Sequence, residues 1–186
     1  MRGTHVRLEP LTPAHAEGLF EATRDPDLWT WLPSRPRTVD EMRQWVTDAV
    51  LTREPYAQVE NGTGRVVGTT SFYEVVPEHR RLVIGYTVVG TDRHGTEITP
   101  EAELLVLTEA FETRRAVRVA WHTDAGDVRS QRAVEELGAE REGVLRGHIT
   151  RPDGTCRDTV VHSVLADEWP AVRERLTNRV WRGPSR

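Results

Sequence analysis

The sequence contains little cysteine, methionine or aromatic side chain: of 186 residues, one is cysteine, two are methionine and 6% are aromatic. The single cysteine, Cys156, cannot form a disulfide within the chain, which argues against a disulfide-rich secreted fold and fits a reducing cytoplasm. No apolar run approaches the ~20 residues that a membrane-spanning helix needs, and the first residues lack the pattern of a signal peptide. We therefore expect a cytoplasmic protein with no membrane partner.

Positive charge is not in excess either. Lysine and arginine together number 25 against 29 aspartates and glutamates, which gives a formal net charge of -4 and a pI near 6.0. Such a balance provides no overall attraction to a polyanion, so a nucleic-acid partner is not expected, although Arg35 and Arg37 could form a local basic patch. The seven histidines show no paired spacing such as HxxxH, so we expect no metal site.

The length of the chain fits one ordinary domain with a substantial core. We assign residues 1–181 to a single α/β domain and residues 182–186 to a C-terminal tail, and we expect one active site. Composition does not distinguish a monomer from a homodimer, so both stay open.

Hydrophobic periodicity predicts strands that alternate with helices. Strand-like runs and a turn dipeptide predict an antiparallel meander that leads, through the segment GTDRHGTEIT, into an apolar helix. Thr99 followed by Pro100 predicts the start of that helix, because threonine caps helices and proline suits their first turn. A later strand and a helix capped by Asp127 predict a parallel strand pair. The expected strands are 5–11, 56–60, 65–75, 81–89, 117–123, 142–150 and 155–165, and the expected helices begin near residues 12, 38, 99, 127 and 167.

Four sequence segments carry a family resemblance, which extends from Val6 to Pro170 and is more specific in the second half. They are IGYTVV, TPEAELLVLTEAFE, VRVAWHTDAGDVRSQRAVEELGAEREGVLR and RPDGTCRDTVVHSVLADEWP. In these segments the sequence resembles the Rim-like branch of the GNAT superfamily of N-acetyltransferases, whose members acetylate ribosomal-protein N-termini among other amines. The resemblance implies a mixed, mostly antiparallel sheet with helices on both faces and splayed central strands.

The same resemblance implies an N-acyltransferase that moves an acyl group from a CoA thioester, expected to be acetyl-CoA, to a primary amine by direct attack. The acceptor would be a small-molecule amine or a protein N-terminus. Backbone N–H groups of the loop and the dipole of the following helix would hold the donor pyrophosphate. The donor-binding residues implied in this way are Val88, Val89, His94, Gly95, Thr96, Glu97, Ile98, Thr99, Asp127 and Ser130.

The donor loop departs from the general family pattern, which reads Gln or Arg, two residues, Gly, one residue, then Gly or Ala. Those three positions hold His94, Glu97 and Thr99 here. A carboxylate ~4 Å from a phosphate charge would oppose binding by roughly 4 kcal/mol at an effective dielectric near 20. Two alternatives follow: the same fold with another activated donor, such as an aminoacyl-tRNA, or a non-catalytic GNAT-like binding domain.

Acyl transfer to an amine needs a group that accepts a proton from the ammonium and a group that protonates the leaving thiolate. His122 and Glu74 are candidate bases, and Glu103 is a further alternative. Ser130 is a candidate thiolate donor, because Val134 stands where many relatives have tyrosine. For each of these residues a role in packing or on the surface is the competing interpretation.

Aromatic residues provide candidates for the acceptor side of the site. Trp29 and Trp31 lie in the segment WTWLPSRP between the first two expected helices, where GNAT relatives bind substrate. Tyr86 lies on the expected central strand and could donate a hydrogen bond to the acceptor. Packing is the alternative role for all three.

Overall fold

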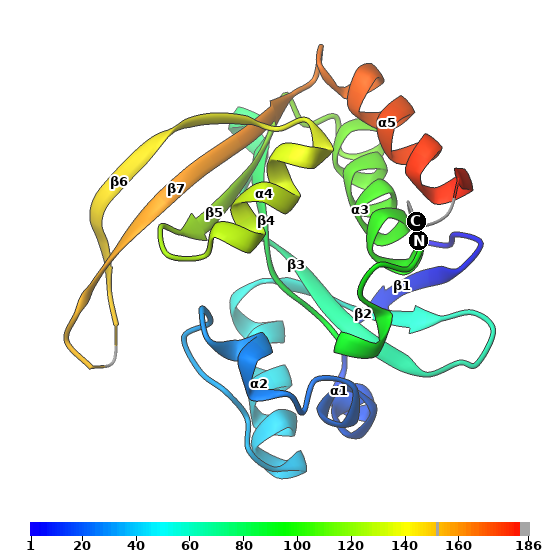
Figure 1. Cartoon of the computed structure of the whole chain (residues 1–186), viewed down its shortest axis with the longest axis vertical. Coiled ribbons are helices and arrows are strands. Elements are labelled where there is room, and N and C mark those ends of the chain that lie inside the picture. Colours follow the sequence, from blue (N-terminus) through cyan, green and yellow to red (C-terminus); the bar gives the residue numbers. More distant parts are fainter. Residues whose placement is uncertain (152, 183–186) are drawn as a thin grey trace.

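The computed structural model describes residues 1–151 and 153–182 and contains one seven-stranded sheet with helices on both faces (Figure 1). The strands are β1 (Val6–Pro10), β2 (Glu54–Glu60), β3 (Val66–Val76), β4 (Arg81–Val89), β5 (Arg118–Asp124), β6 (Glu140–Thr150) and β7 (Cys156–Leu165). The helices are α1 (Ala16–Ala22), α2 (Val39–Thr52), α3 (Ile98–Thr108), α4 (Val128–Leu137) and α5 (Trp169–Arg182). Residues 183–186 of the expected tail lie outside the described part, and α5 continues through Arg182.

The strand order β1-β2-β3-β4-β5-β7-β6 is mixed and mostly antiparallel. Only β4 and β5 pair in parallel, as the predicted strand, helix, strand sequence requires. The predicted fold class is therefore confirmed. None of the helices within the described ranges has the length and apolar character needed to cross a lipid bilayer.

Two hydrophobic cores lie on opposite faces of the sheet. Helices α1 and α2 pack on one core, and α3, α4 and α5 pack on the other. On β4, Leu82 and Ile84 belong to the α3 core, whereas Val88 belongs to the α1–α2 core. Side chains two residues apart on a strand normally share a face, so Ile84 and Val88 would lie on the same side of a regular strand. An extra residue must therefore lie between Ile84 and Val88.

The extra residue is a β-bulge centred near Tyr86. The register between β3 and β4 shifts by one residue between the pairs Ser71↔Gly85 and Thr69↔Val88, and Tyr86 has a left-handed backbone with φ of 53°. A second bulge on β3 accompanies Glu74, whose φ is 45°. Such conformations are strained for residues other than glycine and gather at functional sites.

The parallel pairing of β4 with β5 is short. It runs from Arg81↔Arg118 to Ile84↔Trp121 and then stops, although β4 continues to Val89 and β5 to Asp124. The two strands therefore part after Ile84 and Trp121, and their facing backbone edges have no strand partner. This is the splayed pair that the family resemblance predicts.

The predicted start of α3 at Thr99 is wrong. The helix begins at Ile98, with Glu97 as its N-cap residue and no side-chain hydrogen bond at the cap. Ile98 is buried in the α3 core, and the helix begins two residues before Pro100, the first helical residue that the sequence predicts. Pro100 still falls within the first turn, where its missing N–H group breaks no helical hydrogen bond.

Glu101 fastens β1 to α3. Its buried carboxylate accepts hydrogen bonds from the backbone N–H groups of Thr4, His5 and Val6, at 2.7, 2.7 and 2.8 Å. Three backbone donors at the start of the edge strand are thus satisfied by one side chain, which holds α3 in place beside the sheet.

We expect Glu101→Ala to lower the free energy of unfolding by roughly 3–5 kcal/mol, because it leaves three N–H groups without a partner. Denaturant unfolding followed by circular dichroism measures this change. Glu17→Ala, at an exposed position of α1, is the matched control and should change stability by less than about 0.5 kcal/mol. Equal stability of the two variants would contradict the anchoring role.

Candidate active site

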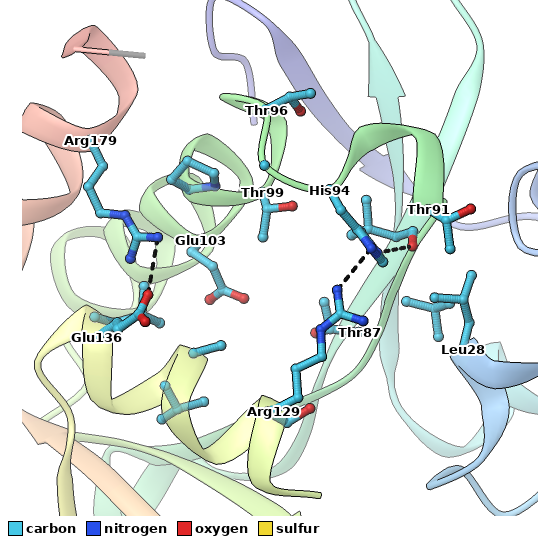
Figure 2. Close-up of a pocket in the computed structure, with 18 of the residues that line it drawn as sticks. Leu28, Thr87, Thr91, His94, Thr96, Thr99, Glu103, Arg129, Glu136 and Arg179 are labelled. Carbon is cyan, nitrogen blue, oxygen red and sulfur yellow. Dashed lines mark hydrogen bonds and ion pairs between the residues drawn. The ribbon is translucent and has the colours of Figure 1, made fainter. Parts of the chain in front are cut away.

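A cavity of about 1140 Å³ opens where β4 and β5 part (Figure 2). Its walls come from the end of β4, the loop before α3, the first turns of α3, and helices α4 and α5. The structure brings together nearly all the residues that the resemblance assigns to donor binding: Val88, Val89, His94, Gly95, Thr96, Glu97, Thr99, Asp127 and Ser130 all line this cavity. Ile98 is the exception, because its side chain is buried in the α3 core.

His94, in the loop before α3, contacts both the end of β4 and the first turn of α4. Its Nε2 lies 3.0 Å from the carbonyl oxygen of Val89, and its Nδ1 lies 2.8 Å from Nη2 of Arg129 (Figure 2). A guanidinium can only donate, so Nδ1 accepts from Arg129 and the ring proton must be on Nε2, which donates to Val89. The loop is thereby held to the end of β4 and to the first turn of α4.

Arg129 is a cavity residue that the sequence reasoning missed. It is exposed, lines the cavity, and forms no ion pair with a carboxylate in residues 1–151 and 153–182. Glu97, in the loop before α3, also lines the cavity. Its place two residues after the expected N-cap Asp127 was a usable signal, because that turn of α4 borders the parted strands.

Asp127 is the N-cap of α4. Its Oδ1 accepts a hydrogen bond from the backbone N–H of Ser130 at 3.0 Å, as the sequence predicts for a capping aspartate. A carboxylate at this end also interacts favourably with the helix dipole. Ser130 faces the cavity from the same turn.

The candidate residues Glu74, Tyr86 and His122 are not among the residues that line the cavity, and they form a separate cluster beside the point where the strands part. His122 is the first β5 residue after the last β4–β5 pair, and its Nδ1 lies 3.9 Å from Oε1 of Glu74. The ring of Tyr73 packs edge-on against both Tyr86 and His122, with centroids 5.4 and 6.1 Å apart. His148, from β6, packs against His122 at 5.9 Å. Both bulges thus contribute, since they place Glu74 and Tyr86 in this cluster.

Burial controls the charge of these side chains. It lowers the pKa of His122 below its usual range, and the nearby carboxylate of Glu74 opposes that shift only in part. His122 is therefore neutral at pH 7 and can accept a proton. Burial raises the pKa of Tyr73, which keeps its hydroxyl protonated. Tyr86 is covered on its other face by Arg53, whose guanidinium carbon lies 4.0 Å from the ring centroid.

The two tryptophans have different environments. Trp29 is 3% exposed, donates its indole N–H to the carbonyl of Thr23 at 2.7 Å, and packs in the α1–α2 core. Trp31 is 41% exposed, lines the cavity and reaches the turn between β5 and α4. A Cβ added at Gly126 would lie only 2.6 Å from Cη2 of Trp31. Trp31 therefore spans the parted halves of the sheet, and Gly126 provides the space for its ring.

Glu103 lies away from the His122 cluster. Its side chain points into the cavity from α3 (Figure 2), and its Oε2 atom is buried without a hydrogen-bond partner in the described residues. Desolvation raises the pKa of this carboxyl to about 7. In residues 1–151 and 153–182 no group of three or more His, Cys, Asp or Glu side chains could hold a metal ion.

The sequence profile of the acetyltransferase (GNAT) domain matches residues 5–140, which is well over half of the chain. The protein belongs to the GNAT acetyltransferase family. Parted central strands, a loop and helix N-terminus facing a cavity, and a neutral histidine at the parting point agree with acyl transfer as its chemistry. No curated protein matches the chain.

Solved structures of other GNAT proteins are similar over nearly the whole chain. A GCN5-related N-acetyltransferase from Brucella melitensis is 29% identical with a TM-score of 0.91, covering 96% of this chain and 84% of that one. A candidate acetyltransferase from T. thermophilus is 40% identical with a TM-score of 0.88, covering 97% and 96%. The ribosomal-protein-S5-alanine acetyltransferase from Vibrio fischeri is 17% identical with a TM-score of 0.72, covering 91% and 97%, and shares the fold.

We expect Glu103→Gln to stabilise this GNAT protein at pH 8 by up to about 3 kcal/mol, and to have little effect near pH 4.5. The folded-state pKa is raised, so the native state binds more protons than the unfolded state and loses stability as pH rises from about 4.5 to 7. Denaturant unfolding at several pH values measures the difference. Glu140→Gln, on the exposed strand β6, is the control and should give a pH-independent difference. A Glu103→Gln difference that does not change with pH would disprove the buried ionisation.

Proposed function

We propose that the protein is an N-acetyltransferase that uses acetyl-CoA as donor and a primary amine, on a small molecule or at a protein N-terminus, as acceptor. The observation that carries the proposal is one continuous cavity that joins the end of β4, the loop before α3 and the first turn of α4. The parted strands leave the backbone of β4 open along this cavity, so a thioester arm could pair with it much as a strand would.

Two features support a phosphate-bearing donor in this cavity. The loop before α3 and the N-terminus of that helix line the cavity, so the positive end of the helix dipole lies beside it. Arg129, from the first turn of α4, adds a full positive charge to the cavity lining. This charge would attract a pyrophosphate and so reduce the effect of the repulsion from Glu97.

The reaction needs no covalent enzyme intermediate. The amine nitrogen attacks the thioester carbonyl carbon, the C–N bond forms, and the C–S bond breaks with release of the thiolate. His122, assisted by Glu74, accepts the proton that the ammonium loses. Ser130, which lines the cavity, donates a proton to the leaving thiolate. Trp31 and Tyr86 flank the acceptor, whereas Trp29 supports the wall from the core.

Calorimetric titration with acetyl-CoA, followed by a thiol-release assay with a panel of primary amines, tests this function. We expect micromolar binding and amine-dependent release of one thiol per acetylated amine. The chain has no lysine, so side-chain amines of the protein cannot act as internal acceptors in the assay. Absence of both acetyl-CoA binding and turnover would reject acetyl-CoA as donor. If the protein instead bound an aminoacyl-tRNA with an affinity that falls steeply as salt rises, an aminoacyl-tRNA donor would be favoured.

Arg129→Ala should weaken acetyl-CoA binding about tenfold, because it removes the charge-assisted contact proposed for the donor phosphates. Glu97→Gly changes the charge in the opposite direction and should preserve or strengthen binding. Arg132→Ala, at an exposed position of α4 outside the cavity lining, is the matched control and should bind as the wild type does. Equal losses in Arg129→Ala and Arg132→Ala would contradict the assignment.

His122→Gln should lower kcat about 100-fold, since general-base catalysis contributes at least that factor in most enzymes. Burial lowers the pKa of His122, so the wild-type kcat/KM should be level above about pH 6.5 and fall only below it. The kcat/KM of the His122→Gln variant should not show this fall at acid pH. His79→Gln, on the exposed segment before β4, should keep both the wild-type kcat and the fall of kcat/KM at acid pH. The same fall of kcat/KM in His122→Gln would show that His122 is not the general base.

A further inference from the structure

Arg53 is a charged side chain near the His122 cluster that the proposed reaction does not use. It directly follows α2 as the C-cap residue of that helix, and it is half-buried. Its guanidinium carbon lies 4.0 Å from the ring centroid of Tyr86 and 4.7 Å from that of Trp45. The two aromatic rings hold the planar group in one position, so the directions of its N–H groups are fixed.

This guanidinium lacks a counter-ion. Arg53 forms no ion pair with a carboxylate in residues 1–151 and 153–182, and the adjacent acid, Glu54, pairs with another arginine. In the same part of the chain, Nη2 of Arg53 is buried without a hydrogen-bond partner, and Nη1 makes only a long hydrogen bond, 3.5 Å to the hydroxyl of Thr52. Burial also lowers the pKa of Arg53. A desolvated charge with free donors costs stability unless a ligand supplies the missing anion.

Two tyrosine rings separate Arg53 from the proposed general base. Tyr86, which Arg53 covers, packs edge-on against Tyr73, with ring centroids 5.4 Å apart. Tyr73 in turn packs edge-on against His122, at 6.1 Å. A substrate whose amine lies at His122 therefore passes the two tyrosines before it reaches the guanidinium.

We propose that Arg53 binds a carboxylate of the acceptor, so that the substrate is an amine that also carries a carboxylate several bonds from the reacting nitrogen. The planar fork of N–H groups matches the two oxygens of a carboxylate. This inference rests on the proposed N-acetyltransferase function and names the class of its acceptor.

The spacing of the site selects among such amines. An α-amino acid joins both groups to one carbon atom, which is too short to span the two rings between Arg53 and His122. An ω-amino acid has the required length, and so does a peptide N-terminus that is followed by an acidic side chain.

Acceptors of equal length test the carboxylate in the wild-type protein. With acetyl-CoA as donor, kcat/KM should be at least about tenfold higher for δ-aminovalerate than for δ-aminovaleramide, in which a neutral amide replaces the carboxylate, and most of the difference should lie in KM. Free glycine should show no such advantage over glycinamide. The peptides alanyl-glutamate amide and alanyl-glutamine amide repeat the comparison at a peptide N-terminus and so distinguish a small-molecule from a peptide source of the carboxylate.

Arg53→Gln should lower kcat/KM about tenfold for δ-aminovalerate and leave δ-aminovaleramide within twofold. Arg53→Lys keeps the charge but not the planar fork, so it should retain part of the preference for the acid. A purely structural role of Arg53 would instead lower kcat/KM equally for the acid and the amide. Arg43→Gln is the matched control, because Arg43 lies exposed on α2 and pairs with Asp40, and it should keep the wild-type preference.

The outcomes distinguish the acceptor class from the function. Equal kcat/KM for every acid and its amide in the wild type, or equal losses for both in Arg53→Gln, would overturn the carboxylate site, while turnover itself would uphold the acetyltransferase function. If Arg53→Gln did not fold, the wild-type comparison would decide alone. No release of thiol with any amine would overturn the proposed function, and the carboxylate site with it.

Discussion

Backbone pairing between β4 and β5 ends at Ile84 and Trp121, and every part of the site takes its position from that point. The β-bulge near Tyr86 moves Val88 to the opposite face of the sheet, so the end of β4 packs on the α1–α2 core while its start packs on the α3 core. The pairing of the two strands stops just before this bulge. The cavity opens where the strands part, and the His122 cluster lies beside that point, where the second bulge places Glu74.

Two charged residues from separate elements line the cavity. Glu97 makes the loop before α3 more acidic than the family pattern, and Arg129, from the first turn of α4, adds a positive charge and donates a hydrogen bond to His94. Charge compensation across a cavity is invisible in a local motif, because the two residues are far apart in the sequence. Glu103 from α3 and Arg175 from α5 likewise line this cavity although they are far apart in the sequence.

Much of the fold could be predicted because local signals agreed with one another. The caps at Asp127 and Gly138 delimit α4 as expected, with Gly138 in a left-handed conformation at its end. The start of α3 could not be predicted from Thr99 and Pro100, since burial of Ile98 in the core overrides the capping preference. The sequence gives no reason to distinguish Trp29 from Trp31. Only the packing shows that Trp29 is a core residue and that Trp31 is exposed and reaches Gly126.

The sequence by itself determined the class of protein, the order of the elements and nine of the residues that line the cavity, because these depend on periodicity, caps and a family resemblance spread along the chain. Tertiary structure alone decided that Arg129, Glu103 and Arg175 share that cavity, and that Glu74 lies 3.9 Å from His122. Such contacts join residues from separate elements, and their distances depend on where two bulges bend the strands, which no local pattern encodes.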